Sequence, residues 1–81
     1  MQMANITFVI NPSDAGNIYV GTEIVPIGVP VQFEIGSTIE LHADPALGFE
    51  FLNWNEGESF DMDWSFEVVG DATISADFSA L

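Results

Sequence analysis

The sequence predicts an all-β fold: a single small antiparallel β-domain over residues 1–81, sandwich-like or β-grasp-like. Apolar residues recur at every second position through most of the chain, which is the pattern of strands with one buried and one wet face. Turn-forming residues separate these runs roughly every 8–12 residues, as in small sandwiches and barrels. The chain is 48% hydrophobic and contains no cysteine, so we expect a packed core that no disulfide supports.

The first half of the chain contains a clear strand, a hairpin and a broken segment. Apolar side chains alternate from Ile6 to Ile10, and the loop-forming sequence at residues 11–16 ends this strand. A short hairpin turns at residues 20–22, and two prolines and a glycine interrupt residues 26–30. We therefore expect one long strand and one short hairpin before residue 31.

The second half contains strands that are separated by glycine-containing turns. Gly36 lies between two alternating runs, and Gly48 and Gly70 lie in turns that close later hairpins. No window has the 3.6-residue repeat of an amphipathic helix, so at most one helical turn is expected, near residues 56–62. With the first half, this gives about six to eight short strands. The alternating runs are residues 32–35, 38–44, 49–51, 64–68 and 73–78.

The inward-facing side chains of these runs predict the core. Aromatic rings dominate it, because each large ring buries on the order of 150–250 Å². Four of the rings have an alternative role as an exposed platform on which a sugar stacks: Phe49, Phe51, Trp54 and Trp64. Alternation places most of them on apolar faces, which favours the core interpretation. The expected structural core consists of Phe8, Phe33, Leu41, Phe49, Phe51, Trp54, Trp64, Phe66, Ile74 and Phe78.

The charge of the chain excludes several classes of function. It has 13 acidic residues and no lysine or arginine, which gives a formal net charge of −13. Without basic side chains it cannot neutralise a phosphate backbone, form a Schiff base or supply an arginine finger, so we expect no nucleic-acid partner. No segment approaches the ~20 apolar residues of a membrane span, so no membrane insertion is expected. The acidic residues expected on wet strand faces are Glu34, Glu40, Glu50, Glu67 and Asp77.

The same charge indicates the kind of partner the protein has. An acidic coat favours a basic protein surface, whereas apolar residues outside the core favour contact with copies of the same chain. The N-terminus has neither the basic region nor the apolar stretch of a signal peptide. The absence of lysine and arginine also removes the cleavage sites of trypsin-like proteases, which suits an exposed module. The candidate contact residues are Val9, Tyr19, Ile24, Val25, Ile27, Val29, Leu47 and Val69.

Carboxylates are concentrated in the loop that follows Trp54. Oxygen-rich clusters of this kind suit Ca²⁺, which takes about six to eight oxygen ligands. The spacing does not match an EF-hand loop, so the alternative is a solvated acidic loop that holds cations diffusely. No other cofactor is expected. The candidate metal ligands are Glu56, Glu58, Asp61 and Asp63.

His42 is the only histidine of the chain, and it lies between Glu40 and Asp44 on the polar side of an alternating run. A lone imidazole can act as half of an acid–base pair, but a catalytic triad also needs an ordered nucleophile and an oxyanion hole, which no motif marks. An 81-residue sheet also has little room for the cleft that paired catalytic carboxylates need. We therefore expect no enzymatic activity, no catalytic residue and an exposed strand histidine.

Four segments follow one another in a recurring order. A glycine turn at Gly36 leads into an alternating strand that ends in Ala-Asp-Pro at residues 43–45. The segment Gly-Phe-Glu-Phe-Leu-Asn-Trp follows at residues 48–54, and the final strand ends at Phe78. This order resembles the divergent internalin B-repeat domain, a module repeated in bacterial surface proteins, over residues 5–79. The resemblance implies a β-rich spacer or adhesive unit without catalytic residues.

These features predict a non-enzymatic structural or binding module that acts by protein–protein contacts on an extracellular surface. It would be a bacterial cell-surface repeat unit, or a structural or decoration subunit of a bacteriophage virion, since virion proteins are released by lysis without a signal peptide. The alternative is a carbohydrate- or Ca²⁺-dependent adhesion module. In that alternative, the aromatic segment or the carboxylates of residues 56–63 bind the ligand.

Overall fold

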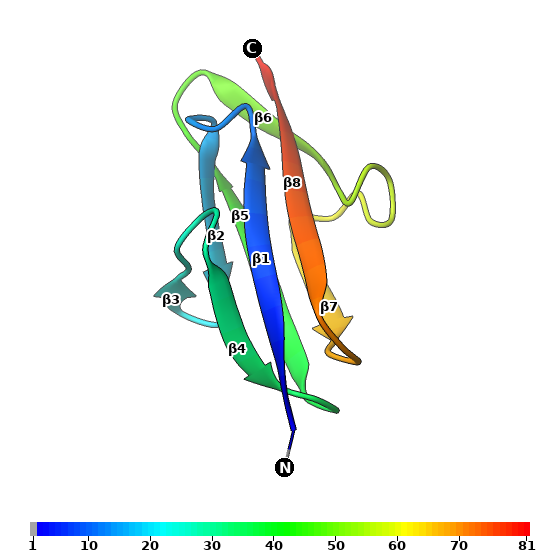
Figure 1. Cartoon of the computed structure of the whole chain (residues 1–81). Helices are drawn as coiled ribbons and strands as arrows, with labels where there is room; N and C mark the ends of the chain where they lie inside the picture. Colours follow the sequence, from blue (N-terminus) through cyan, green and yellow to red (C-terminus); the bar gives the residue numbers. More distant parts are fainter. Residues whose placement is uncertain (1) are drawn as a thin grey trace.

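Alternating apolar residues form eight strands in the computed structural model, which describes residues 2–81 (Figure 1). These residues contain no helix, and their strands build two four-stranded sheets. The prediction of an all-β, sandwich-like fold is therefore confirmed. The strands are β1 (Met3–Asn11), β2 (Gly16–Val20), β3 (Glu23–Ile24), β4 (Pro30–Glu34), β5 (Thr38–Pro45), β6 (Phe49–Trp54), β7 (Asp63–Glu67) and β8 (Ala72–Ala80).

The two sheets differ in strand order. Sheet A has the order β4-β1-β8-β6, and sheet B has the order β3-β2-β5-β7. All neighbours in sheet B are antiparallel, as are β1 with β4 and β6 with β8 in sheet A. Apart from the link between β2 and β3, every connection between these strands crosses from one sheet to the other. Strands that are distant in sequence therefore become neighbours.

The first and last strands, β1 and β8, lie side by side and run parallel. Their register joins Ile6 to Ala72 at one end and Asn11 to Asp77 at the other. The prediction of an antiparallel domain is therefore wrong for this pair. Side chains alternate in the same way in parallel and antiparallel strands, so the apolar pattern carries no information on strand direction.

Because β1 and β8 are parallel, the two ends of the chain lie at opposite ends of the molecule (Figure 1). The carbonyl of Gln2 accepts a 2.9 Å hydrogen bond from the N–H of Ile35, beside the turn from β4 to β5. The N–H of Leu81 donates a 2.8 Å bond to the carbonyl of Gly48, in the turn from β5 to β6. The molecule measures 43 Å along its longest axis and 22 and 21 Å across. We call its two ends the N-terminal pole and the C-terminal pole.

The core lies between the sheets and is filled by every second side chain of each long strand. Ile6, Phe8 and Ile10 of β1 are buried, whereas Thr7 and Val9 between them are half-buried. Trp54 is also fully buried, and its indole N–H donates a 2.8 Å hydrogen bond to the carbonyl of Asp61. Of the expected core residues, Phe8, Leu41, Trp54, Ile74 and Phe78 are buried, and Phe33, Phe49, Phe51, Trp64 and Phe66 are half-buried against them.

The ends of two apolar runs depart from the predicted faces. Val25, which the sequence indicates as a contact residue, is buried, because its N–H donates a 3.0 Å bond to the carbonyl of Ile18 and holds it against the core. Ile35 ends an alternating run but is exposed, because the chain turns at Gly36, where φ is 95°. A hydrogen bond in the first case and a turn in the second, rather than the alternation of the strand, set the direction of the side chain.

The segment after Trp54 forms a tight left-handed turn, and the helical turn that the sequence allowed near residues 56–62 is not formed. Asn55 and Glu56 have φ values of 48° and 59°, which no right-handed helix contains. An isolated antiparallel bridge between Trp54 and Ser59 closes the turn. Asparagine tolerates this conformation better than most residues, and the side-chain amide of Asn55 also donates to Glu58 at 2.7 Å.

Candidate functional site

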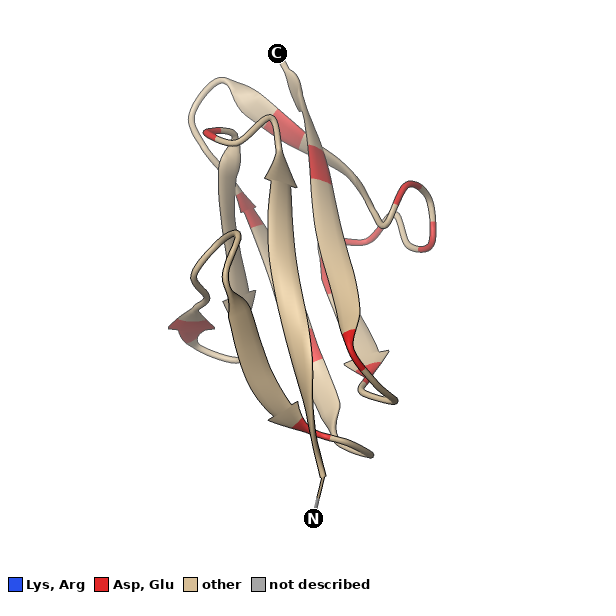
Figure 2. Ribbon diagram, viewed as in Figure 1, with Lys and Arg blue, Asp and Glu red and all other residues tan. Residues whose placement is uncertain are grey.

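Both sheets carry acidic residues (Figure 2). In sheet A these are Glu34 on β4, Glu50 on β6 and Asp77 on β8. Strand β1, in the middle of sheet A, carries no carboxylate. The outward positions of β5 and β7 in sheet B carry several, and no lysine or arginine balances them. We call this surface of sheet B the acidic face, and its carboxylates are Glu40, Asp44, Asp63 and Glu67.

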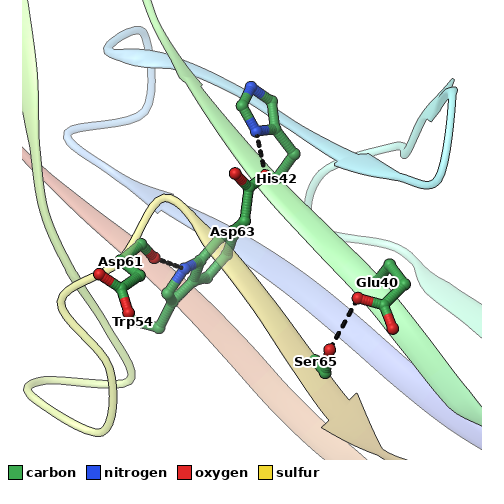
Figure 3. Close-up of polar contacts among 6 residues, drawn as sticks. All are labelled: Glu40, His42, Trp54, Asp61, Asp63 and Ser65. Atoms are coloured by element: carbon green, nitrogen blue, oxygen red, sulfur yellow. Dashed lines mark hydrogen bonds and ion pairs between the residues drawn. The ribbon is translucent and has the colours of Figure 1, made fainter.

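His42 lies in a row of three outward side chains on the acidic face. Its Nδ1 lies 2.6 Å from Oδ1 of Asp63, so the imidazole N–H donates to the carboxylate (Figure 3). On the other side, the centroid of the Tyr19 ring lies 6.4 Å from that of the imidazole. The side chains of His42 and Asp63 are 44% and 83% exposed, so water screens the pair and it adds little stability.

Cross-strand register, rather than sequence proximity, selects the partner of His42. The sequence places it between Glu40 and Asp44, but β7 brings Asp63 opposite it. The same register places Ser65 opposite Glu40, where the serine hydroxyl donates a 2.7 Å hydrogen bond to Oε2 of Glu40 (Figure 3). The hydroxyl therefore bonds to a carboxylate in a neighbouring row and not to the imidazole. Apolar alternation does not fix register, so neither contact has a signal in the sequence.

The carboxylates that the sequence indicates as metal ligands are not assembled into one site. The side chain of Glu58 accepts a hydrogen bond from Asn55 inside the tight turn, whereas Asp63 lies on the acidic face and bonds to His42. Within residues 2–81, no three His, Cys, Asp or Glu side chains lie close enough together to hold a metal ion. The left-handed turn and strand β7 separate the predicted set, Glu56, Glu58, Asp61 and Asp63.

The aromatic residues form a connected row inside the sandwich. The ring centroid of Trp54 lies 5.9 Å from that of Trp64 and 5.4 Å from that of Phe51. The ring centroids of Phe51 and Phe78 lie 5.7 Å apart, and those of Trp64 and Phe66 lie 5.6 Å apart. Both pairs have edge-to-face geometry. Trp54 is fully buried and offers no face to a sugar. The row packs the core, so the four-ring platform considered from the sequence, with Phe49 as its remaining member, is not formed.

Exposed apolar side chains lie at both poles of the molecule. Leu47 is fully exposed and Leu81 is 83% exposed at the C-terminal pole, where Leu81 bonds to the turn that contains Leu47. Val69 is 74% exposed at the N-terminal pole, beside the turn at Gly36. Of the predicted contact residues, Ile24, Ile27, Val29, Leu47 and Val69 are exposed, and Val9 and Tyr19 are half-buried.

The sequence interpretation gave no role to the apolar residues of the loop between β6 and β7. Phe60 and Met62 are exposed there, although acidic residues surround them in the sequence. The sequence did contain a signal for these exposed apolar residues. A solvated acidic loop does not require bulky apolar side chains, so their presence there indicates a contact surface.

The fold defines a class, small all-β sandwich domains, that serves many unrelated functions. Comparison with protein-family models, with curated proteins and with solved structures gave no match. The resemblance to the internalin B-repeat domain therefore stays a prediction from the sequence. In the part of the chain that the structure describes, no helix has the length and hydrophobicity needed to cross a membrane.

Proposed function

We propose that the protein is a non-enzymatic structural module that is joined in series with neighbouring domains on an extracellular surface. The observation that supports this most is the parallel pairing of β1 and β8, which brings the two ends of the chain to opposite poles of a 43 Å long domain. A chain that enters at one pole and leaves at the other adds length when such modules follow one another. A domain with adjacent ends would add a side branch instead.

The apolar residues at the poles support the same proposal. Leu47 and Leu81 at one end, and Val69 at the other, are exposed where consecutive modules would meet. Burying one such side chain contributes about 1.5–3 kcal/mol relative to leaving it in water. Contact between the poles of two copies, or with another domain, would therefore favour an extended arrangement over a flexible one.

The acidic face supplies a second kind of contact in this proposal. It extends along the outer side of sheet B, on β5 and β7, so a series of modules would present it repeatedly to a partner. Its carboxylates favour a basic protein surface, and their long-range field would accelerate association at low salt. A bacterial cell surface or a virion is the proposed setting; the family resemblance and the absence of lysine and arginine support it.

Small-angle scattering from tandem proteins tests the serial arrangement. One, two and three copies are joined from C-terminus to N-terminus with a short linker, and the maximum dimension of each is measured. The proposal predicts that each copy adds close to the 43 Å long axis of one domain. The matched control is a dimer cross-linked through Thr73→Cys, at an exposed position on the outer side of sheet A, because its copies lie side by side. Tandems no longer than this control would refute the proposal.

A further inference from the structure

The two terminal strands are the strands on which tension would act if the domain stands in series with others. We propose that the parallel β1–β8 pair is a shear clamp, through which the domain withstands tension applied along its long axis. The inference rests on the proposed serial function and adds a mechanical role to it. It follows from strand direction, from the hydrogen bonds at both ends of the pair and from the position of the pair within sheet A.

Strand direction determines how the hydrogen bonds of the pair are loaded. Tension pulls β1 toward the N-terminal pole and β8 toward the C-terminal pole, so the strands must slide past each other. The two strands are paired from Ile6 opposite Ala72 to Asn11 opposite Asp77. The backbone hydrogen bonds between them run across the direction of sliding, so tension loads all of them at the same time. In an antiparallel terminal pair, the same tension would open the bonds one after another from the free end.

Two further hydrogen bonds bracket the pair. The backbone N–H of Asn5 donates to Oδ1 of Asp71 at 2.8 Å, just before β8 begins. At the other end, the side-chain amide of Asn11 donates to Oδ1 of Asp77 at 3.2 Å. Both bonds join residues that are 66 positions apart in the sequence, so both match the register of the ladder. Sliding by one residue would break both bonds together with the ladder.

The position of the pair in sheet A adds resistance. Both strands are interior, since β4 covers the other side of β1 and β6 covers the other side of β8. Among their inward side chains, Phe8 of β1 and Ile74 of β8 are fully buried. Sliding must therefore pull apolar side chains out of the core while the hydrogen bonds break, which raises the barrier to forced unfolding.

Single-molecule force spectroscopy along two axes of the same protein tests the clamp. In the first axis, handles are attached at the two ends of the chain. In the second, a Leu47→Cys variant is held at residue 47 and at the C-terminus; the chain has no cysteine of its own, so the attachment is unique. This second axis peels β6 from β8, because Phe49 pairs with Ala80 at the pulled end. The first axis is measured on the same Leu47→Cys variant, so thermodynamic stability is the same in both experiments and only the direction of loading differs.

The clamp predicts an unfolding force several-fold higher along the end-to-end axis than along the peeling axis at one loading rate. Asn11→Ala should lower the force along the end-to-end axis alone, and Asn17→Ala, on the exposed side of β2, should lower neither. Equal forces along the two axes, or an Asn11→Ala effect of the same size on both, would overturn the clamp. Either result would leave the length of the tandem proteins unchanged, so the serial function is tested separately.

Discussion

Asn11 and Asp77 tie the first strand of the domain to the last. Nδ2 of Asn11 donates a 3.2 Å hydrogen bond to Oδ1 of Asp77 across the parallel pair, and Asn5 reaches Asp71 with the same separation of 66 residues. Because the separation is the same at both places, the two contacts together require that β1 and β8 run in the same direction. The parallel direction of β1 and β8 also places the two ends of the chain far apart. The two hydrogen bonds and the proposed serial arrangement therefore have the same structural cause.

The close approach of β2 to β5 at Gly16 gives the first prediction. A Cβ at Gly16 would overlap the carbonyl oxygen of Asp44 and lie 3.1 Å from Cα of Pro45, so the two strands would have to separate. Gly16→Ala should therefore lower the free energy of unfolding by about 2 kcal/mol or more. Gly70→Ala is the matched control, since no atom lies within 4 Å of its Cβ position. It should be neutral or stabilise by about 0.4–1 kcal/mol. Urea unfolding measures both, and equal effects would contradict the packing described for Gly16.

The buried indole of Trp54 gives the second prediction. Trp54→Phe removes core volume and leaves the carbonyl of Asp61 without its 2.8 Å donor. The variant should lose about 2–4 kcal/mol of unfolding free energy. Trp64→Phe, at a half-buried position in the same aromatic row, should lose clearly less. Chemical denaturation followed by circular dichroism measures both variants, and a larger loss for Trp64→Phe would contradict the assigned positions.

The uncompensated charge of −13 gives the third prediction. Raising the ionic strength from about 0.01 M to about 1 M shortens the Debye length from about 30 Å to about 3 Å, which screens the repulsion between exposed carboxylates. The midpoint of urea unfolding should therefore rise with sodium chloride concentration. Urea is the appropriate denaturant, because guanidinium chloride is itself a salt. A midpoint that stays constant or falls would mean that repulsion does not limit stability.

The separation of the four loop carboxylates gives the fourth prediction. Because no shared ligand set forms, calcium should stabilise the domain only by screening charge. Calcium and magnesium chloride at equal ionic strength should then raise the melting temperature by similar amounts. A clearly larger rise of the melting temperature with calcium, which Glu58→Gln abolishes, would show a specific calcium site in this loop. That result would support the alternative function as a Ca²⁺-dependent adhesion module.

Burial along the strands could be predicted from the sequence, because a strand with one wet face imposes a period of two. The side chains of Ile6, Phe8 and Ile10 follow this rule, and they are buried in the structure. Val25 could not be predicted, since it follows a strand of only two residues and its direction depends on a hydrogen bond to Ile18. The alternation of apolar residues predicts which side of a strand is buried only where the strand is long enough for the alternation to repeat.

Strand partners could not be predicted, because pairing depends on contacts between distant parts of the chain. The hydrogen bond from His42 to Asp63 joins β5 to β7, and the sequence instead grouped Asp63 with Glu58 as metal ligands. The parallel direction of β1 and β8 was missed for the same reason. Both the candidate surface and the proposed function depend on these long-range pairings.

The distance between the two ends of the chain is the most direct test of the parallel pairing of β1 and β8. Spin labels at Met3→Cys and Leu81→Cys can be measured by double electron–electron resonance, since the chain has no other cysteine. In the parallel register, these positions lie about twelve residue steps apart along the strands, or about 40 Å at roughly 3.3 Å a step. Parallel pairing of β1 and β8 predicts one narrow distribution near that distance. A distribution below about 20 Å, as adjacent ends on antiparallel neighbours would give, would contradict it.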